Sequence, residues 1–281
     1  MAGTAQAAQD EGLNIVTFHR LAAFIYEYSG IKMPPSKITM LEGRLRRRLR
    51  ATGLSNFEEY CDHLFDKDGE GELVNFIDAV TTNKTDFFRE PRHFDVMQGP
   101  VLSDLADRGH REIRAWSSAC STGAEPYTMA MILEEAVTRR DIDSYAILAT
   151  DLSSDVLQQA HRAVYDAQFL DPVPQDLASK YLMQPLARHR TEMRVSPKLR
   201  RRVSFARLNL MDESYPVGDA MHMIFCRNVL IYFDKQTQRK VLSRLCECLL
   251  PGGFLFIGHS ESITGLDLPV RQVANTVFAK D

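Results

Sequence analysis

The residues most able to do chemistry directly follow apolar runs. SSACSTGAEPY (117–127) comes after EIRAW, and its small residues, Ala119 among them, would let backbone N–H groups approach a ligand. Asp151 ends a second apolar run, ILATD, where a carboxylate can accept hydrogen bonds from the hydroxyls of an adenosine ribose. A plain tight turn and a helix cap are the alternative interpretations. Together the two features favour an adenosine ligand.

Glu125 and Pro126 indicate which adenosine ligand fits. A pyrophosphate prefers a glycine-rich loop that leads into a helix N-terminus, whereas this loop holds only Gly123. Glu125 places a negative charge where a phosphate would lie, and Pro126 removes an N–H donor. ATP and NAD are therefore disfavoured, and S-adenosylmethionine, which has a cationic amine and no phosphate, fits better. Alternatively, Glu125 only complements the helix dipole.

The segment NKTDFFRE (83–90) carries closely spaced hydrogen-bonding side chains, namely Asn83, Thr85 and Arg89. A linker that crosses the end of a sheet could use Arg89 to bind a carboxylate, because a guanidinium pairs with a carboxylate in bidentate fashion. The spacing is equally consistent with an interdomain salt bridge.

A third group of polar side chains lies in FCRNVLIYFD (225–234), which contains Arg227, Asn228 and Tyr232. Polar groups at the carboxyl end of a strand form the site of an open α/β sheet. A purely structural role for these side chains is the alternative. GHSES (258–262) suggests a hydrolase triad, but we reject it because the sequence contains no G-x-S-x-G elbow.

The segment GRLRRRLR (43–50) is strongly basic. On a helix its leucines would share one side and its arginines would flank and oppose them. The common interpretation is a solvated face, and the sharper hypothesis is a docking surface for an acidic protein helix. Nucleic acid is not expected, because aromatic residues are not interleaved and the net charge is −3. The arginines concerned are Arg44, Arg46, Arg47, Arg48 and Arg50.

The composition is that of an ordinary soluble globular protein. A length of 281 residues suggests about two domains, and 44% of the residues are hydrophobic. The five cysteines are widely spaced and odd in number, which predicts reduced thiols in a cytoplasmic protein and no metal site. No apolar run approaches the roughly 20 residues that span a bilayer. Residues 1–13 lack the features of a signal peptide and are expected to form a disordered tail.

The elements that must position these residues change character along the chain. Residues 14–82 show helical spacing of apolar side chains, which predicts a domain of about four helices, and the break in this pattern predicts a linker over 83–94. From 95 to 281, apolar strands alternate with helices, which predicts a mostly parallel sheet covered on both faces. The predicted strands are 112–117, 145–150, 202–207, 221–226 and 254–258, and the predicted helices are 125–138, 154–163 and 235–249.

Two further stretches of this second domain depart from the alternation. Residues 165–200 are rich in proline, and 181–195 within them could form an inserted β-hairpin. Two short apolar runs flank Asn275 and predict an antiparallel hairpin that closes the sheet.

Taken together, NKTDFFRE, SSACSTGAEPY, ATDLS, LNL and FCRNVLIYF, in this order and spacing, resemble the CheR family of chemotaxis receptor methyltransferases. The resemblance covers about residues 15–278. It implies an α/β, Rossmann-like S-adenosylmethionine-dependent methyltransferase domain that follows a small all-α domain and carries an inserted β-hairpin subdomain. It also implies methyl transfer to glutamate side chains of bacterial chemoreceptors, with S-adenosylhomocysteine as the product.

The resemblance implies roles for individual residues. The basic segment would dock the cytoplasmic helices of the receptor, and the insertion at about 165–200 is similar to a β-subdomain that in some members docks a receptor C-terminal peptide. Catalytic roles are implied for Arg89 and Tyr232. The implied cofactor contacts are Asn83, Thr85, Arg89, Ala119, Glu125, Asp151, Asn209, Leu210, Arg227 and Asn228.

The expected reaction is in-line methyl transfer from a sulfonium to a glutamate carboxylate. Such a carboxylate, with a pKa of about 4.3, is already ionised at neutral pH, so no strong base is needed to remove a proton from it. The protein must then supply alignment and exclude water, with Tyr232 contacting the substrate and Arg89 shared with the cofactor. The alternatives are an O-methyltransferase for a small molecule or a non-receptor protein, and a cofactor-binding regulatory module without activity. We expect a monomer without membrane insertion.

Overall fold

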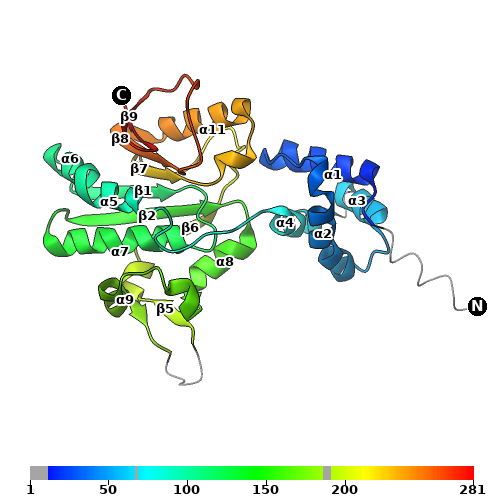
Figure 1. Cartoon of the computed structure of the whole chain (residues 1–281), viewed down its shortest axis with the longest axis horizontal. Helices are drawn as coiled ribbons and strands as arrows, with labels where there is room; N and C mark the ends of the chain where they lie inside the picture. Colours follow the sequence, from blue (N-terminus) through cyan, green and yellow to red (C-terminus); the bar gives the residue numbers. More distant parts are fainter. Residues whose placement is uncertain (1–11, 67–68, 186–190) are drawn as a thin grey trace, which may run out of the picture. The chain divides into compact units, whose positions relative to one another are not determined.

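The computed structural model describes residues 12–66, 69–185 and 191–281. The chain forms two compact units, Met1–Thr82 with Tyr232–Asp234, and Asn83–Ile231 with Lys235–Asp281. Figure 1 colours the elements of both along the chain. Residues 1–11 of the expected tail and residues 186–190 of the expected hairpin loop lie outside the described residues.

The described part of the first unit contains four α-helices, as predicted. Gly53 ends the second of them with a left-handed backbone (φ 73°), and Asn56 caps the third by accepting hydrogen bonds from two backbone N–H groups. Pro35 opens a short 3-10 turn that leads into the second helix. The helices are α1 (Ile15–Ser29), α2 (Ile38–Thr52), α3 (Phe57–Phe65) and α4 (Glu70–Val80).

The second unit is built on a seven-stranded sheet with the order β6-β2-β1-β7-β8-β10-β9. The first five strands pair in parallel, and β10 pairs antiparallel with both β8 and β9. This confirms the predicted sheet and its closing hairpin. The bounds are β1 (Glu112–Ser117), β2 (Ser144–Asp151), β6 (Val203–Arg207), β7 (Met221–Cys226), β8 (Leu249–Ile257), β9 (Val270–Ala274) and β10 (Val277–Lys280).

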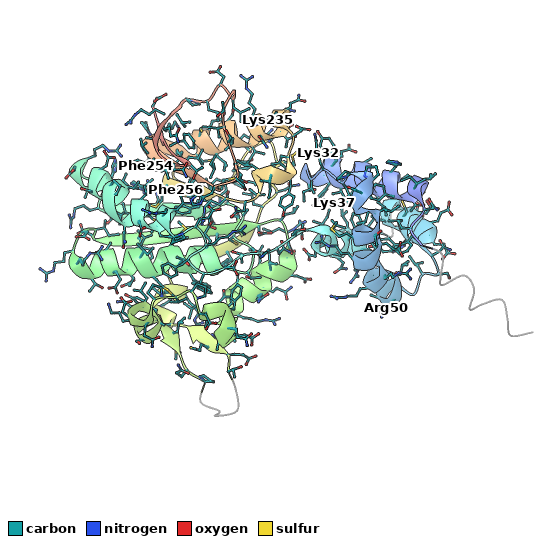
Figure 2. All side chains as sticks on the ribbon, viewed as in Figure 1. Lys32, Lys37, Arg50, Lys235, Phe254 and Phe256 are labelled. Carbon is teal, nitrogen blue, oxygen red and sulfur yellow. The ribbon has the colours of Figure 1, made fainter. Side chains whose placement is uncertain are left out.

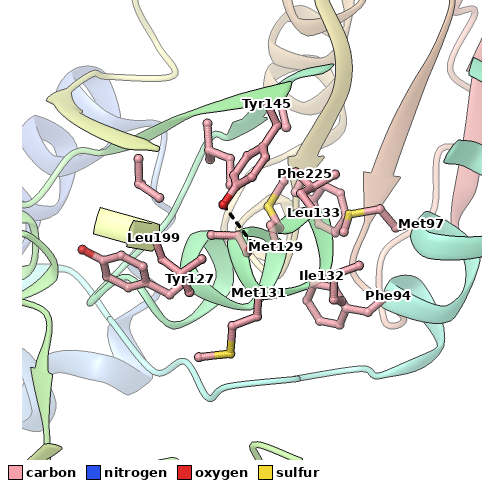
Figure 3. Close-up of a cluster of buried hydrophobic side chains, with 14 of the residues drawn as sticks. Phe94, Met97, Tyr127, Met129, Met131, Ile132, Leu133, Tyr145, Leu199 and Phe225 are labelled. Carbon is pink, nitrogen blue, oxygen red and sulfur yellow. Dashed lines mark hydrogen bonds between the residues drawn. The ribbon is translucent and has the colours of Figure 1, made fainter. Parts of the chain in front are cut away.

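Helix α7 (Ala124–Arg139) is the centre of the core of this unit. It packs against β1, β2 and β6, and nearly every side chain in its first three turns is buried. Figure 3 shows Met129, Ile132 and Leu133 of α7 together with Phe94 and Phe225. Helix α8 (Ser154–Arg162) covers β2 and β6, and α11 (Lys235–Glu247) covers β8. The core therefore fixes the N-terminus of α7 at the carboxyl edge of the sheet.

The insertion forms a small antiparallel sheet of the order β3-β5-β4. β4 (Leu182–Met183) and β5 (Met193–Val195) are the predicted hairpin, whereas β3 (Val164–Tyr165) was not predicted because two residues are too few to show a period. α9 (Gln175–Tyr181) precedes β4, and the Tyr181 hydroxyl donates to Glu135 of α7 at 2.6 Å. The insertion is thereby fastened to the helix that leads away from the small-residue loop.

Residues 92–107 form a helical segment that the sequence analysis did not predict. It consists of α5 (Arg92–Val96), the π-helical turn η4 (Met97–Val101) and α6 (Leu102–Asp107). Gly99 and Pro100 obscure the pattern, because proline lacks the backbone donor of a regular helix, and the wider π turn accommodates it. No helix within the described ranges is both long enough and apolar enough to cross a membrane.

Candidate active site

The small-residue loop lies at the carboxyl edge of the sheet because its backbone is bonded to both strands beside β1. The Ser118 N–H donates to the Phe225 carbonyl of β7 at 2.9 Å, and the Cys120 N–H donates to the Thr150 carbonyl of β2 at 2.8 Å. Ala119 lies between these two attachments and is half-buried. The loop is therefore fixed between two strand ends.

Gly123 lies where a side chain would collide with its surroundings. Its φ is +93°, and a Cβ here would lie 2.9 Å from both Ala160 Cβ and Tyr165 Oη. The Tyr165 hydroxyl, which comes from the inserted sheet, donates to the Thr122 carbonyl at 2.7 Å. The single glycine of the loop is thus explained by its backbone conformation and by the residues beneath it.

Asp151 orients the loop through its carboxylate. Oδ2 accepts from the Ser121 N–H at 2.8 Å, and Oδ1 accepts from the Ser153 N–H at 3.0 Å. The Ser121 hydroxyl in turn donates to the Asn83 carbonyl of the linker at 2.8 Å. Each carboxylate oxygen can accept two hydrogen bonds, so the half-buried Asp151 is held by backbone donors in an arrangement that also suits a hydroxyl ligand.

Glu125 is held by a buried arginine. Arg227 Nη1 lies 2.9 Å from Glu125 Oε2, and Arg227 Nη2 lies 2.9 Å from Glu90 Oε2. The Arg227 side chain is only 2% exposed, and its guanidinium lies 5.5 Å from the ring centre of Phe94. The Ser117 hydroxyl donates to the other Glu125 oxygen at 2.7 Å. The geometry makes Arg227 a residue that positions Glu125.

Glu90 joins the linker to the loops that follow β7 and β8. Its carboxylate accepts from Asn228 Nδ2 at 3.1 Å and from the His259 N–H at 3.2 Å. Burial alone would raise the pKa of Glu90, but the hydrogen bond from Asn228 and the charge of Arg227 together lower that pKa to about 2. Burial, assisted by the charge of Arg227, lowers the pKa of the neighbouring His93 to about 4.

Glu261 fastens the same two loops from the other side. Its carboxylate accepts from the backbone N–H groups of Asn228 at 3.0 Å, Gly258 at 2.6 Å and Leu230 at 2.7 Å. Burial raises the pKa of Glu261, and these backbone donors oppose that rise. Glu261 thus holds the backbone of Asn228, while Glu90 holds its side-chain amide.

Four residues of these loops adopt a left-handed backbone without being glycine. Their φ angles are 53° for Phe88, 58° for Glu90, 50° for Ser121 and 59° for Asn228. A non-glycine residue in this region costs on the order of 1 kcal/mol or more, and such residues cluster at functional sites. The strain is concentrated where the linker, the small-residue loop and the β7 loop meet.

The turn after β6 is attached to the same edge. The Leu208 N–H donates to the Asp151 carbonyl at 3.0 Å, which continues the pairing of β6 with β2. Asn209 then accepts from the Met211 N–H at 3.0 Å, and the Leu210 carbonyl accepts from a tyrosine hydroxyl at 2.6 Å. Asn209 and Leu210 therefore lie in a fixed turn that begins at the end of the Asp151 strand.

The linker residues reach the site in different ways. Asn83 contacts the small-residue loop through Ser121, and Asn83 and Thr85 both line an open hollow of about 960 Å³ bounded also by α8 and the inserted sheet. Arg89 Nη1 donates to the Lys84 carbonyl at 2.8 Å, so this side chain folds back on its own segment. The hollow thus adjoins the loop on the side of the linker.

Tyr232, the second catalytic candidate, groups with the first unit, whereas Arg89 belongs to the second. The Tyr232 carbonyl accepts from the Lys32 N–H at 3.0 Å, and Lys37 Nζ lies 5.9 Å from the centre of the Tyr232 ring. The structure therefore does not bring the two catalytic candidates together within one unit.

Two of the five arginines of α2 serve the helical unit itself. Arg48 makes a bidentate pair with the buried Glu72, at 2.8 and 2.6 Å. Arg44 donates to the backbone carbonyls of Val80 and Thr81 at the end of α4. Both side chains join α2 to α4, and they are poorly placed to contact a partner.

The other three arginines lie nearer to solvent. Arg46 pairs with Glu42 one turn earlier at 2.6 Å, and its side chain is still 43% exposed. Arg47 and Arg50 are exposed, and Figure 2 labels Arg50 near the C-terminal end of α2. The basic surface that a partner could contact therefore consists of Arg46, Arg47 and Arg50, and not of all five arginines.

Glu90 and Glu261 are site residues that sequence reasoning did not select. Glu90 directly follows Arg89 in a segment already singled out, and Glu261 was considered only as a member of a hydrolase triad. The partners of Glu90 are far away along the chain, since 137 residues separate it from Arg227, and Glu261 reaches back 33 residues to Asn228. The sequence did offer one indication of their role, since each carboxylate lies in a segment that contains other candidate site residues.

The strand order is the Rossmann-type order 3-2-1-4-5 extended by an antiparallel hairpin, and its carboxyl edge is acidic. This arrangement defines the class of Rossmann-like S-adenosylmethionine-dependent methyltransferases. Two family descriptions match the chain, "CheR methyltransferase, all-alpha domain" over residues 17–81 and "CheR methyltransferase, SAM binding domain" over residues 83–279. The chain belongs to the CheR methyltransferase family.

Relatives with this description extend over nearly the whole chain. Chemotaxis protein methyltransferase 2 of Pseudomonas aeruginosa is 39% identical over 265 residues, which cover 93% of this chain and 92% of the relative. The chemotaxis protein methyltransferase of Salmonella typhimurium is 38% identical over 274 residues, 98% of this chain and 93% of the relative. These findings confirm the predicted family, fold class, enzyme class and methyl donor.

Proposed function

We propose that this enzyme transfers a methyl group from S-adenosylmethionine to glutamate side chains of bacterial chemoreceptors, as part of chemosensory adaptation. The observation that carries the proposal is the match of both units to the CheR methyltransferase family, together with relatives described as chemotaxis protein methyltransferases. The acidic edge of the sheet supports it, because a ligand with a cationic amine and no phosphate suits the carboxylate of Glu125. The products are a glutamate methyl ester and S-adenosylhomocysteine.

The residues at the carboxyl edge fit this cofactor. We assign the ribose to Asp151, whose oxygens are oriented by two backbone donors, and the amine to Glu125. Ala119 offers a small side chain beside the cofactor, while Arg227 holds Glu125 in place and Asn228 is held by two carboxylates. The remaining proposed contacts are Asn83, Thr85, Arg89, Asn209 and Leu210.

When bound, the cofactor supplies an electrophilic methyl group on a sulfonium, and the protein supplies alignment. A substrate glutamate is ionised at neutral pH, so no side chain needs to remove a proton from it. Positive and negative charges neutralise each other as the methyl transfers, so strong pairing of the substrate carboxylate would slow the reaction. We propose that Tyr232 and Arg89 orient the substrate lightly and do not act as acid or base.

The receptor helix is proposed to dock on the exposed arginines of α2. Arg47 and Arg50 are exposed, and Arg46 is partly exposed, whereas the other two arginines of the helix are held by internal partners. An acidic helix surface is the complementary partner. Contacts between exposed opposite charges chiefly raise the rate of association, and they weaken as the salt concentration rises.

The test is methylation of receptor-containing membranes with labelled cofactor, in which a methyl ester is recognised by the methanol it releases in base. Replacing Arg47 and Arg50 by alanine should lower receptor methylation about tenfold at low salt and leave cofactor binding unchanged. The charge-matched control replaces the exposed Arg239 and Arg271 of the second unit. Equal activity of the two double variants would refute the docking surface, and no base-labile label with any variant or the native chain would refute the proposed substrate.

A receptor C-terminal peptide is proposed as a second contact, added to the edge strand β4 of the inserted sheet. Met183 of β4 is 48% exposed, and an edge strand offers unpaired backbone groups to an extended peptide.

All five cysteines are free thiols, which agrees with the cytoplasmic location that a receptor-modifying enzyme requires. We propose that the enzyme acts as a monomer.

A further inference from the structure

A carboxylate and two imidazoles meet beside the buried Arg227 pair. Glu90, His93 and His259 each offer one ligand atom, and these atoms lie within 4.8 Å of one another. His93 Nδ1 is 3.4 Å from Glu90 Oε2, and the ring centres of the two histidines are 4.7 Å apart. The His93 side chain is 1% exposed, whereas His259 is exposed. The proposed methyl transfer gives this trio no role.

The hydrogen bonds around Thr276 favour the tautomer of His93 that carries its proton on Nε2. The Thr276 hydroxyl donates to the Asn275 carbonyl at 2.8 Å, so its oxygen accepts from His93 Nε2–H at 2.7 Å. Nδ1 then carries a lone pair and has no hydrogen-bond partner among the described residues. Two acceptors, His93 Nδ1 and Glu90 Oε2, therefore face each other, and a cation between them would satisfy both.

The distances suit a first-row transition metal. With metal–ligand bonds of about 2.1 Å, neighbouring ligands of a tetrahedral ion lie about 3.4 Å apart, which is the separation of His93 Nδ1 and Glu90 Oε2. The exposed His259 can close the remaining distance by rotating its side chain. Two imidazoles with one carboxylate form a ligand set that Zn²⁺ prefers, with a fourth position left for water.

The surroundings support such an ion. The bond from His93 Nε2–H to Thr276 is the kind of outer hydrogen bond that orients a metal-binding histidine. Arg227 pairs with Glu90 and would repel a cation. Its positive charge is also paired with Glu125, so this group contains two carboxylates and one guanidinium. A divalent cation thus enters a cluster whose net charge is negative.

We propose that Glu90, His93 and His259 form a binding site for a divalent transition metal of the zinc type at the edge of the cofactor site. The site joins two segments that are distant in sequence, namely residues 90–93, where the linker enters α5, and the loop after β8. Cysteine spacing gave no hint of it, since no cysteine takes part.

The experiment titrates the full-length, cofactor-free chain with Zn²⁺ by calorimetry, and with Co²⁺ by visible absorption. We expect one saturable site, with affinity lowered about tenfold or more in His259→Ala. His259 is exposed, so this variant should keep its fold, which circular dichroism checks. The matched control is His110→Ala, since His110 belongs to another histidine pair, with ring centres 4.9 Å apart.

Several results would overturn the proposal. They are the absence of saturable Zn²⁺ binding, affinity unchanged in His259→Ala, and an equal loss in His110→Ala. Intense thiolate-to-cobalt absorption would also overturn it, because it would assign the ion to cysteines. Glu90→Gln provides a second test on the carboxylate, and it should lower Co²⁺ affinity while the fold is retained. None of these measurements depends on methyl transfer, so they stand apart from the proposed function.

Discussion

Replacing Gly123 by alanine should destabilise the enzyme more than the same replacement at Gly265. Gly123 and Gly265 both have left-handed backbones, with φ of +93° and +79°. A Cβ at Gly265 would meet nothing within 4 Å, whereas one at Gly123 would lie 2.9 Å from Ala160 Cβ and from Tyr165 Oη. The two substitutions therefore share the backbone strain and differ in the collision.

The magnitudes follow from these two contributions. The left-handed backbone should cost about 1–2 kcal/mol in each variant. Overpacking against the buried Ala160 and Tyr165 should add about 1–3 kcal/mol in Gly123→Ala alone. We expect Gly265→Ala to lower the free energy of unfolding by about 1–2 kcal/mol, and Gly123→Ala by about 2–5 kcal/mol.

Urea titration followed by tryptophan fluorescence measures this difference, because the one tryptophan, Trp116, is buried in β1 of the second unit. Calorimetry with S-adenosylhomocysteine should show weakened binding for Gly123→Ala and unchanged binding for Gly265→Ala. Tyr165→Phe removes one of the two colliding atoms, so it should cost less in the Gly123→Ala background than alone. Equal unfolding free energies for the two alanine variants, or strict additivity with Tyr165→Phe, would refute the reasoning.

Three further predictions concern single side chains. Asp151→Asn keeps one acceptor oxygen of two, so affinity for S-adenosylhomocysteine by calorimetry should fall by about 1–3 kcal/mol, and unchanged affinity would remove Asp151 from the site. Burial lowers the pKa of His222 to about 4; the unfolded chain therefore binds this proton more readily, and stability should fall as pH drops from about 6.5 to about 4. His222→Asn should lose less stability in urea titrations over that range, and equal losses would contradict the assignment. Arg48→Met leaves the buried Glu72 without its cationic partner and should lower the free energy of unfolding by about 3 kcal/mol in thermal unfolding. The control Arg47→Met, at an exposed position, should lower it by less than about 0.5 kcal/mol. Similar losses in both variants would contradict a stabilising Arg48–Glu72 pair.

The sheet and the position of the site could be predicted because they depend on local patterns. Apolar runs of strand length alternate with helical spacing, and each candidate segment directly follows a strand. Parallel strands bring their carboxyl ends to one edge, so the meeting of Asp151, Asn209 and the 117–123 loop at that edge follows from the order of the elements.

The partners of individual side chains could not be predicted in the same way. Glu125 meets Arg227 across 102 residues, and nothing in the spacing of either segment records that pairing. Arg48 resembles its neighbours in the basic run, yet it alone reaches the buried Glu72. The helix over 92–107 was missed because a proline and a glycine interrupt its period, and only the packed structure shows that a π turn absorbs them.

The contact between Tyr165 and the Thr122 carbonyl has a consequence for attempts to make a minimal enzyme. Tyr165 belongs to the first strand of the inserted sheet, and it lies directly beneath Gly123. Deleting the insertion to obtain a bare catalytic domain would remove this contact with the small-residue loop. A shortened version should therefore keep residues 164–170 and shorten only the outer hairpin. In evolutionary terms, a change in the first strand of the insertion would also alter the small-residue loop.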